Sequence, residues 1–187
     1  MKALDKEMGG DFEKLIFTYL QATEETYDPG FHDTEKMKEY AEKLYKMGQG
    51  KFGTDEAGLF KLLCSSPPEY LQKFNLLYAE KYGFTLVKAV ETEFRETTGP
   101  AAMFMLNMKV KPYEAIANLI DTACKGFGTN ELLLTCTLLR YQSIMKEEVM
   151  LAHIKLFGKP VQERVTAEVG GDYRALLITV LESSDQN

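Results

Sequence analysis

Two short glycine-rich segments, each paired with a distant glutamate, are the residues best suited to do chemistry. The segments are residues 48–53 and 125–128; Glu93 follows the end of the first by 40 residues, and Glu168 follows the end of the second by the same distance. Glycine lets the backbone turn sharply and direct its carbonyl oxygens outward. Ca²⁺ takes about six to eight oxygen ligands, including backbone carbonyls and bidentate carboxylates. The pattern therefore indicates two calcium sites.

The charge of the chain limits its classes of partner. The 187 residues carry a formal net charge of −6, and 45% are hydrophobic, enough for one or two small domains. Nucleic-acid binding needs a basic surface that neutralises phosphates, so we expect no nucleic-acid partner. An acidic chain is also repelled by an anionic membrane. Any binding to such a membrane must therefore be mediated by bound cations.

The cysteines and the start of the chain indicate the compartment. The three cysteines, Cys64, Cys124 and Cys136, form no CxxC pair, which is typical of a reduced intracellular protein. The first residues lack the apolar core of a signal peptide. No stretch approaches the roughly 20 apolar residues of a membrane span. We expect a soluble cytoplasmic protein that contacts membranes only peripherally.

The chain contains internal repeats. Residues 51–56 recur as residues 126–131, an offset of 75 positions that also relates Gly83 to Gly158 and Glu93 to Glu168. Residues near position 10 match a segment near the end of the chain, which indicates a third, partial copy. We predict a partial repeat over 1–21, a polar linker over 22–33, and complete repeats over 34–108 and 109–187.

Each complete repeat is predicted to contain five helices. Apolar residues such as Leu63, Leu71 and Phe74 recur at helical spacing, and no segment shows the period-two alternation of strands. The expected helices of the first repeat are 34–47, 54–64, 67–80, 84–95 and 100–107. Those of the second are 112–124, 129–139, 142–156, 159–168 and 171–182.

These motifs together resemble those of the annexins. The matching landmarks are GTDE at 53–56, GTNE at 128–131 and GGDY at 170–173, in the order of the second half of that family: the end of repeat two, the connector, then repeats three and four. The resemblance implies an all-α fold of five-helix repeats, two complete and one partial, in a right-handed superhelical arrangement. It also implies calcium-dependent binding to anionic phospholipid membranes, without catalysis.

The resemblance further implies two sets of calcium ligands. The first set is the carbonyls of Gly48, Lys51 and Gly53 with the carboxylate of Glu93, and the second is the carbonyls of Cys124, Gly126 and Gly128 with Glu168. Weaker accessory sites are implied at Thr54, Glu56, Thr129 and Glu131. Phe52 and Phe127, at the loop tips, are implied as membrane contacts.

Three alternatives stay open at this level. The segment after Glu93 is three residues longer than its counterpart, so Glu96 competes with Glu93 as the carboxylate ligand. We expect a fragment of a longer annexin rather than a half-length one, with an apolar face on Phe12, Leu15 and Ile16 that a missing half or a second copy would cover. The alternative function is a cytoskeleton-associated scaffold of the same fold whose calcium sites are degenerate.

Overall fold

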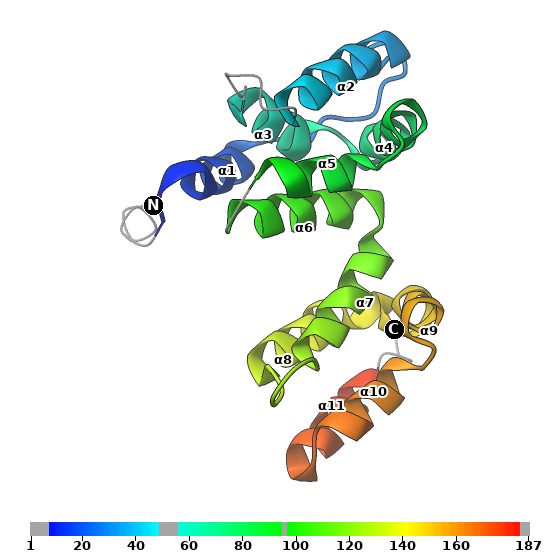
Figure 1. The fold of residues 1–187 in the computed structure, drawn as a ribbon. Coiled ribbons are helices and arrows are strands. Elements are labelled where there is room, and N and C mark those ends of the chain that lie inside the picture. Colours follow the sequence, from blue (N-terminus) through cyan, green and yellow to red (C-terminus); the bar gives the residue numbers. More distant parts are fainter. Residues whose placement is uncertain (1–7, 49–55, 95–96, 184–187) are drawn as a thin grey trace. The chain divides into compact units, whose positions relative to one another are not determined.

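The computed structural model describes residues 8–48, 56–94 and 97–183. All regular elements in these ranges are helical, including the eleven α-helices of Figure 1, which confirms the predicted all-α fold. None of the described helices is both long and apolar enough to span a lipid bilayer. The chain divides into two compact units, Met1–Val110 and Lys111–Asn187, which are described separately.

The first unit contains six helices around one apolar core. They are α1 (Gly10–Gln21), α2 (Thr34–Gly48), α3 (Glu56–Ser65), α4 (Pro68–Tyr82), α5 (Leu86–Glu93) and α6 (Thr98–Val110). Helix α5 packs along α6, and α1 packs against α3 and α6 (Figure 1). Phe60, Phe74 and Tyr78 are almost completely buried and fill the space between these helices. Their burial provides the main favourable contribution to the stability of this unit.

Helix α1 is part of the first core. Leu15 is fully buried there, because α3 and α6 pack against the helix that carries it. Phe12 and Ile16 are only partly buried. The expected exposed face on α1 is therefore smaller than the sequence indicated, since Leu15 already has its partners within the first unit.

The second unit contains five α-helices. They are α7 (Pro112–Ala123), α8 (Glu131–Arg140), α9 (Met150–Phe157), α10 (Val161–Glu168) and α11 (Gly171–Ser183). A 3₁₀ turn at Gln142–Ile144 and a π-helical turn at Met145–Val149 precede α9. The helix predicted over 142–156 is thus three consecutive helical forms. Ile116, Ile120, Leu134 and Leu138 are fully buried in the core of this unit.

Local residue chemistry explains where these helices begin and end. Pro68 and Pro112 occupy the first turns of α4 and α7, where a missing N–H costs little. Gly83 and Gly158 end α4 and α9 with φ of 79° and 73°, a left-handed conformation that glycine adopts without strain. The helices that follow them, α5 and α10, end at Glu93 and Glu168. The repeat therefore places a glutamate at the same helix end in both units.

Candidate calcium sites in the two repeats

The loop between α7 and α8 is a tight turn built on two glycines. Gly126 and Gly128 have φ of 96° and 88°, values that residues with a Cβ rarely adopt. The Asn130 amide donates a hydrogen bond to the Ala123 carbonyl at 2.8 Å and closes the loop. The Asn130 side chain also accepts a hydrogen bond from the Leu133 amide at 3.0 Å, which caps α8. The loop is therefore held at both ends.

Glu168 lies beside this loop although it is far away in sequence. The Thr129 hydroxyl donates a hydrogen bond to Glu168 Oε1 at 3.1 Å. Thr129 directly follows Gly128, so the carboxylate at the end of α10 reaches the end of the glycine turn. The structure thus brings together Thr129 and Glu168. The main-chain carbonyl of Glu131, another predicted accessory residue, accepts a hydrogen bond from the Tyr173 hydroxyl at 3.0 Å.

Arg164 links the loop to the carboxylate. Its Nη2 donates to the Cys124 carbonyl oxygen at 2.6 Å, and its Nη1 donates to Glu168 Oε2 at 3.2 Å. The side chain of Arg164 is only 15% exposed, and it lies one helical turn before Glu168 on α10. A guanidinium group therefore bridges two of the oxygens predicted from the sequence as calcium ligands. Arg164 itself was not among the predicted site residues.

Asp121 completes a charge-balanced cluster. Its Oδ1 lies 3.5 Å from Arg164 Nε, and its Oδ2 lies 2.8 Å from Lys125 Nζ. Asp121 Oδ2 and Arg164 Nε are buried and make no well-oriented hydrogen bond, so these contacts are ionic. Two carboxylates, Asp121 and Glu168, are thus matched by two cations, Arg164 and Lys125. Pairing of this kind offsets the cost of burying Asp121 and Arg164, whereas the Lys125 side chain is 68% exposed.

Part of the second predicted ligand set is engaged by protein donors in this arrangement. The Cys124 carbonyl and both Glu168 oxygens accept hydrogen bonds. Ca²⁺ at the Cys124 carbonyl and Glu168 Oε2 would compete with the Arg164 guanidinium.

Phe127 is fully exposed at the tip of this loop. It stands between Gly126 and Gly128, whose left-handed backbone turns the chain sharply on either side. Leu132, on the first turn of α8, is also 76% exposed. A large aromatic side chain fully exposed beside a candidate cation site is suited to contact with an apolar or interfacial environment.

The loop of the first repeat is described only at its edges. Gly48 ends α2, whereas Lys51, Phe52, Gly53, Thr54 and Glu96 lie outside the described residues. Glu93 ends α5, and its pKa is raised above the usual range by burial and then by the negative charge of Glu56. Glu56 opens α3, where Lys14 Nζ approaches its carboxylate at 3.4 Å.

The two repeats differ at the position of the bridging arginine. The offset of 75 residues places Ala89 where the second repeat has Arg164. Ala89 is buried in α5 and carries no charge. The first repeat therefore has no arginine at the position from which Arg164 bridges the second loop and Glu168.

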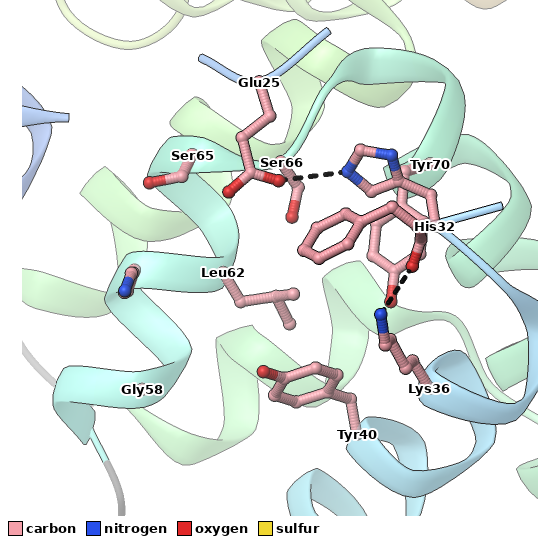
Figure 2. A pocket seen from close by; sticks show the side chains of 11 residues that line it. Glu25, His32, Lys36, Tyr40, Gly58, Leu62, Ser65, Ser66 and Tyr70 are labelled. Atoms are coloured by element: carbon pink, nitrogen blue, oxygen red, sulfur yellow. Dashed lines mark hydrogen bonds and ion pairs between the residues drawn. The ribbon is translucent and has the colours of Figure 1, made fainter. Parts of the chain in front are cut away.

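A cavity of about 300 Å³ in the first unit lies under the predicted linker. Figure 2 shows His32 pointing toward Glu25, with Nε2 and Oε2 3.1 Å apart. The Asp28 amide donates to His32 Nδ1 at 3.0 Å, and Lys36 Nζ donates to the Phe31 carbonyl at 2.9 Å. These polar groups pair with one another, and the Glu25 amide donates to the Ser65 carbonyl at 2.8 Å, which ties the linker to α3. His32 acts as a packing residue here.

The chain is similar to annexins in sequence and in structure. It is 28% identical over 179 residues to annexin A7 of Dictyostelium discoideum, covering 95% of this chain and 38% of that protein. It is 32% identical over 147 residues to annexin A13 of Mus musculus, covering 77% of this chain and 44% of that protein. A structure of calcium-bound annexin (Sm)1 superimposes with a TM-score of 0.76 at 22% identity, covering 95% of this chain and 52% of that one.

These similarities concern part of each relative. The chain spans about half the length of the curated relatives it matches, between 38% and 57% for the first five. No family model matches the sequence. The similarity to annexin A7 of Dictyostelium discoideum nonetheless extends over 95% of this chain.

Proposed function

We propose, from the premise that this chain is annexin-like in sequence and in fold, that it binds anionic phospholipid membranes in a calcium-dependent way. The proposal rests on one observation in the second repeat: the Cys124 carbonyl and the distant Glu168 carboxylate both accept hydrogen bonds from Arg164. This arrangement supports the idea that, in each repeat, the glycine turn and the helix-end glutamate together bind a positive charge.

The first repeat is the calcium site that we propose. Its ligands are the carbonyls of Gly48, Lys51 and Gly53 with the carboxylate of Glu93. The raised pKa of Glu93 is caused by burial and by Glu56, so its ionised form is disfavoured unless a cation compensates it. Ca²⁺ would supply that compensation, and the position that corresponds to Arg164 holds the uncharged Ala89. Glu56 is the accessory carboxylate of the same site.

The bound ion would link the protein to lipid. Ca²⁺ accepts more oxygens than one loop and one carboxylate provide, so phosphate oxygens of a lipid headgroup complete its coordination. The net charge of −6 makes direct attraction to an anionic surface unfavourable, which explains the dependence on calcium. The proposed role is binding without catalysis, in the cytoplasm and peripherally at membranes, with Phe52 and Phe127 touching the interface.

Co-sedimentation with vesicles tests this function. The chain should pellet with phosphatidylserine-containing vesicles in calcium and return to the supernatant when a chelator is added. Binding that is the same with and without calcium would contradict the proposal. It would instead favour a scaffold whose sites are degenerate.

The variant Glu93→Gln tests the proposed ligand. It removes a charged calcium ligand, so we expect the calcium concentration for half-maximal vesicle binding to rise by about tenfold or more, the equivalent of about 1.4 kcal/mol. The matched control is Glu91→Gln, which removes the same charge from an exposed position of α5 that pairs with Lys88. An equal effect of both variants would mean that general charge, and not ligation, determines the response.

A further inference from the structure

We propose that Arg164 is the resident cation of the second repeat, so that this loop is closed to calcium in the native chain. The inference rests on the proposed function only for the identity of the ion. It concerns the repeat whose loop and helix-end glutamate both lie within the described residues.

Arg164 contacts two of the four ligands predicted for a metal in this place. One nitrogen bonds the Cys124 carbonyl at 2.6 Å, and another bonds Glu168 at 3.2 Å. These are the carbonyl at the start of the loop and the helix-end carboxylate of the predicted ligand set. The planar fork of arginine suits this task, since it directs several donors at once toward separate oxygens. The side chain is 15% exposed, which shields the contacts from solvent.

Calcium would have to compete with a cation that is covalently attached to the same helix. The guanidinium loses little conformational entropy when it binds there, because α10 holds it one turn from Glu168. Its removal would also take Asp121, which is 6% exposed, away from one of its two cationic partners. Displacement by Ca²⁺ therefore costs two hydrogen bonds and leaves a buried carboxylate less well compensated.

The first repeat provides an internal comparison. Ala89 stands at the position of Arg164, and Lys46 stands at the position of Asp121. Lys46 forms an exposed pair with Glu42 at 2.6 Å, within its own helix. Of the two complete repeats, only the second therefore has both residues of the Asp121–Arg164 pair. These two differences in sequence give the second repeat an acid–base pair that the corresponding positions of the first repeat lack.

Calcium titration of the full chain by calorimetry, without lipid, tests this inference. We expect Arg164→Ala, which copies the first repeat, to bind one more calcium ion per chain than the native protein does. Adding Glu168→Gln to that variant should abolish the extra ion, which would locate it at the second loop. Arg140→Ala is the charge-matched control, since it removes one exposed arginine at the end of α8, and its stoichiometry should equal the native value.

Thermal unfolding provides a second reading of the same variants. Without calcium, Arg164→Ala should lower the midpoint, because Asp121 and Glu168 lose a common partner, and millimolar calcium should restore part of the loss. Arg164→Lys keeps the charge, so it should gain no calcium ion. Should Arg164→Ala fail to fold, Arg164→Gln replaces it, since it removes the charge and keeps more of the side chain.

The outcomes separate this inference from the proposed function. Equal calcium stoichiometry for Arg164→Ala and the native chain would overturn the inference, even if native vesicle binding depends on calcium. A native chain that ignores calcium, together with a variant that gains an ion reversible by Glu168→Gln, would uphold the inference and overturn the proposed function. Two ions in the native chain, one of them lost in Glu168→Gln, would show that Arg164 yields to calcium and would overturn the inference.

Discussion

Phe127 joins the second loop to the proposed membrane function without acting as a ligand. It is fully exposed between two glycines, and the contact of Arg164 with the Cys124 carbonyl holds the base of the loop. The loop therefore presents the aromatic ring whether or not calcium is bound there. An exposed aromatic ring on a rigid turn can enter the lipid interface with little loss of conformational entropy.

We expect Phe127→Ala to weaken vesicle binding at a fixed calcium concentration by about tenfold. The reason is the lost transfer of apolar surface, since partial burial of a phenylalanine side chain contributes roughly 1.5 kcal/mol. Vesicle co-sedimentation over a range of lipid concentrations measures the change. Calcium stoichiometry in solution should stay as it is, because the side chain holds no ion.

Leu176→Ala is the control for Phe127→Ala. Leu176 is an exposed apolar residue of α11, with 58% of its surface accessible. A general loss of surface hydrophobicity would affect both variants equally. An unchanged affinity for Phe127→Ala would show that this loop tip makes no contact with lipid.

The junction between α5 and α6 controls the position of the first carboxylate. Gly99 lies in the first turn of α6, and a Cβ added to it would collide with the Phe94 carbonyl oxygen, a main-chain atom that cannot rotate away. We expect Gly99→Ala to destabilise the chain by about 1–3 kcal/mol, the usual cost of overpacking. Thermal unfolding should show the lower midpoint. The calcium requirement for vesicle binding should rise as well, because Glu93 directly precedes Phe94.

Gly170→Ala is the matched control at the corresponding junction of the second unit. The nearest atom to an added Cβ there is Arg174 Nη2 at 3.8 Å, an ordinary contact with a flexible side chain. Its effect on the midpoint should be well below that of Gly99→Ala. Equal effects would mean that the tight approach of Gly99 to Phe94 has no energetic consequence.

The elements could largely be predicted because their ends depend on local chemistry. Prolines begin α4 and α7, and left-handed glycines end α4 and α9 at positions that the repeat offset relates. The irregular turns over residues 142–149 could not be predicted this way. Gln142 Nε2 donates to the Val180 carbonyl at 3.1 Å and to Ser183 Oγ at 2.9 Å, contacts with a distant helix that no local pattern encodes.

The candidate site, like the helices, could be predicted from the sequence only in part. The constant spacing of 40 residues correctly indicated that Glu168 lies near the end of its glycine turn. The contacts of Arg164 were missed because an arginine one turn before a glutamate on a helix is usually an exposed pair of little consequence. A comparison of the two repeats could have pointed to Arg164, since the offset of 75 residues aligns this charged residue with the small, apolar Ala89.

Charge at the scale of the whole molecule explains why binding should depend on both calcium and lipid composition. One calcium ion in the first repeat would change the formal charge from −6 to −4, so the chain stays acidic when loaded. General attraction to an anionic surface cannot therefore drive binding. The ion must act locally, between the loop and a lipid phosphate or carboxylate.

The proportion of anionic lipid should then set the calcium requirement. Anionic headgroups concentrate Ca²⁺ at the surface and supply ligands to it, so a higher phosphatidylserine fraction should lower the calcium concentration for half-maximal binding. Vesicles of phosphatidylcholine alone should bind weakly at the same calcium concentration. Co-sedimentation at several lipid ratios, each with its own calcium titration, measures this dependence. A requirement that stays constant across lipid ratios would mean that calcium acts only on the protein, and that the bridge from loop to headgroup does not form.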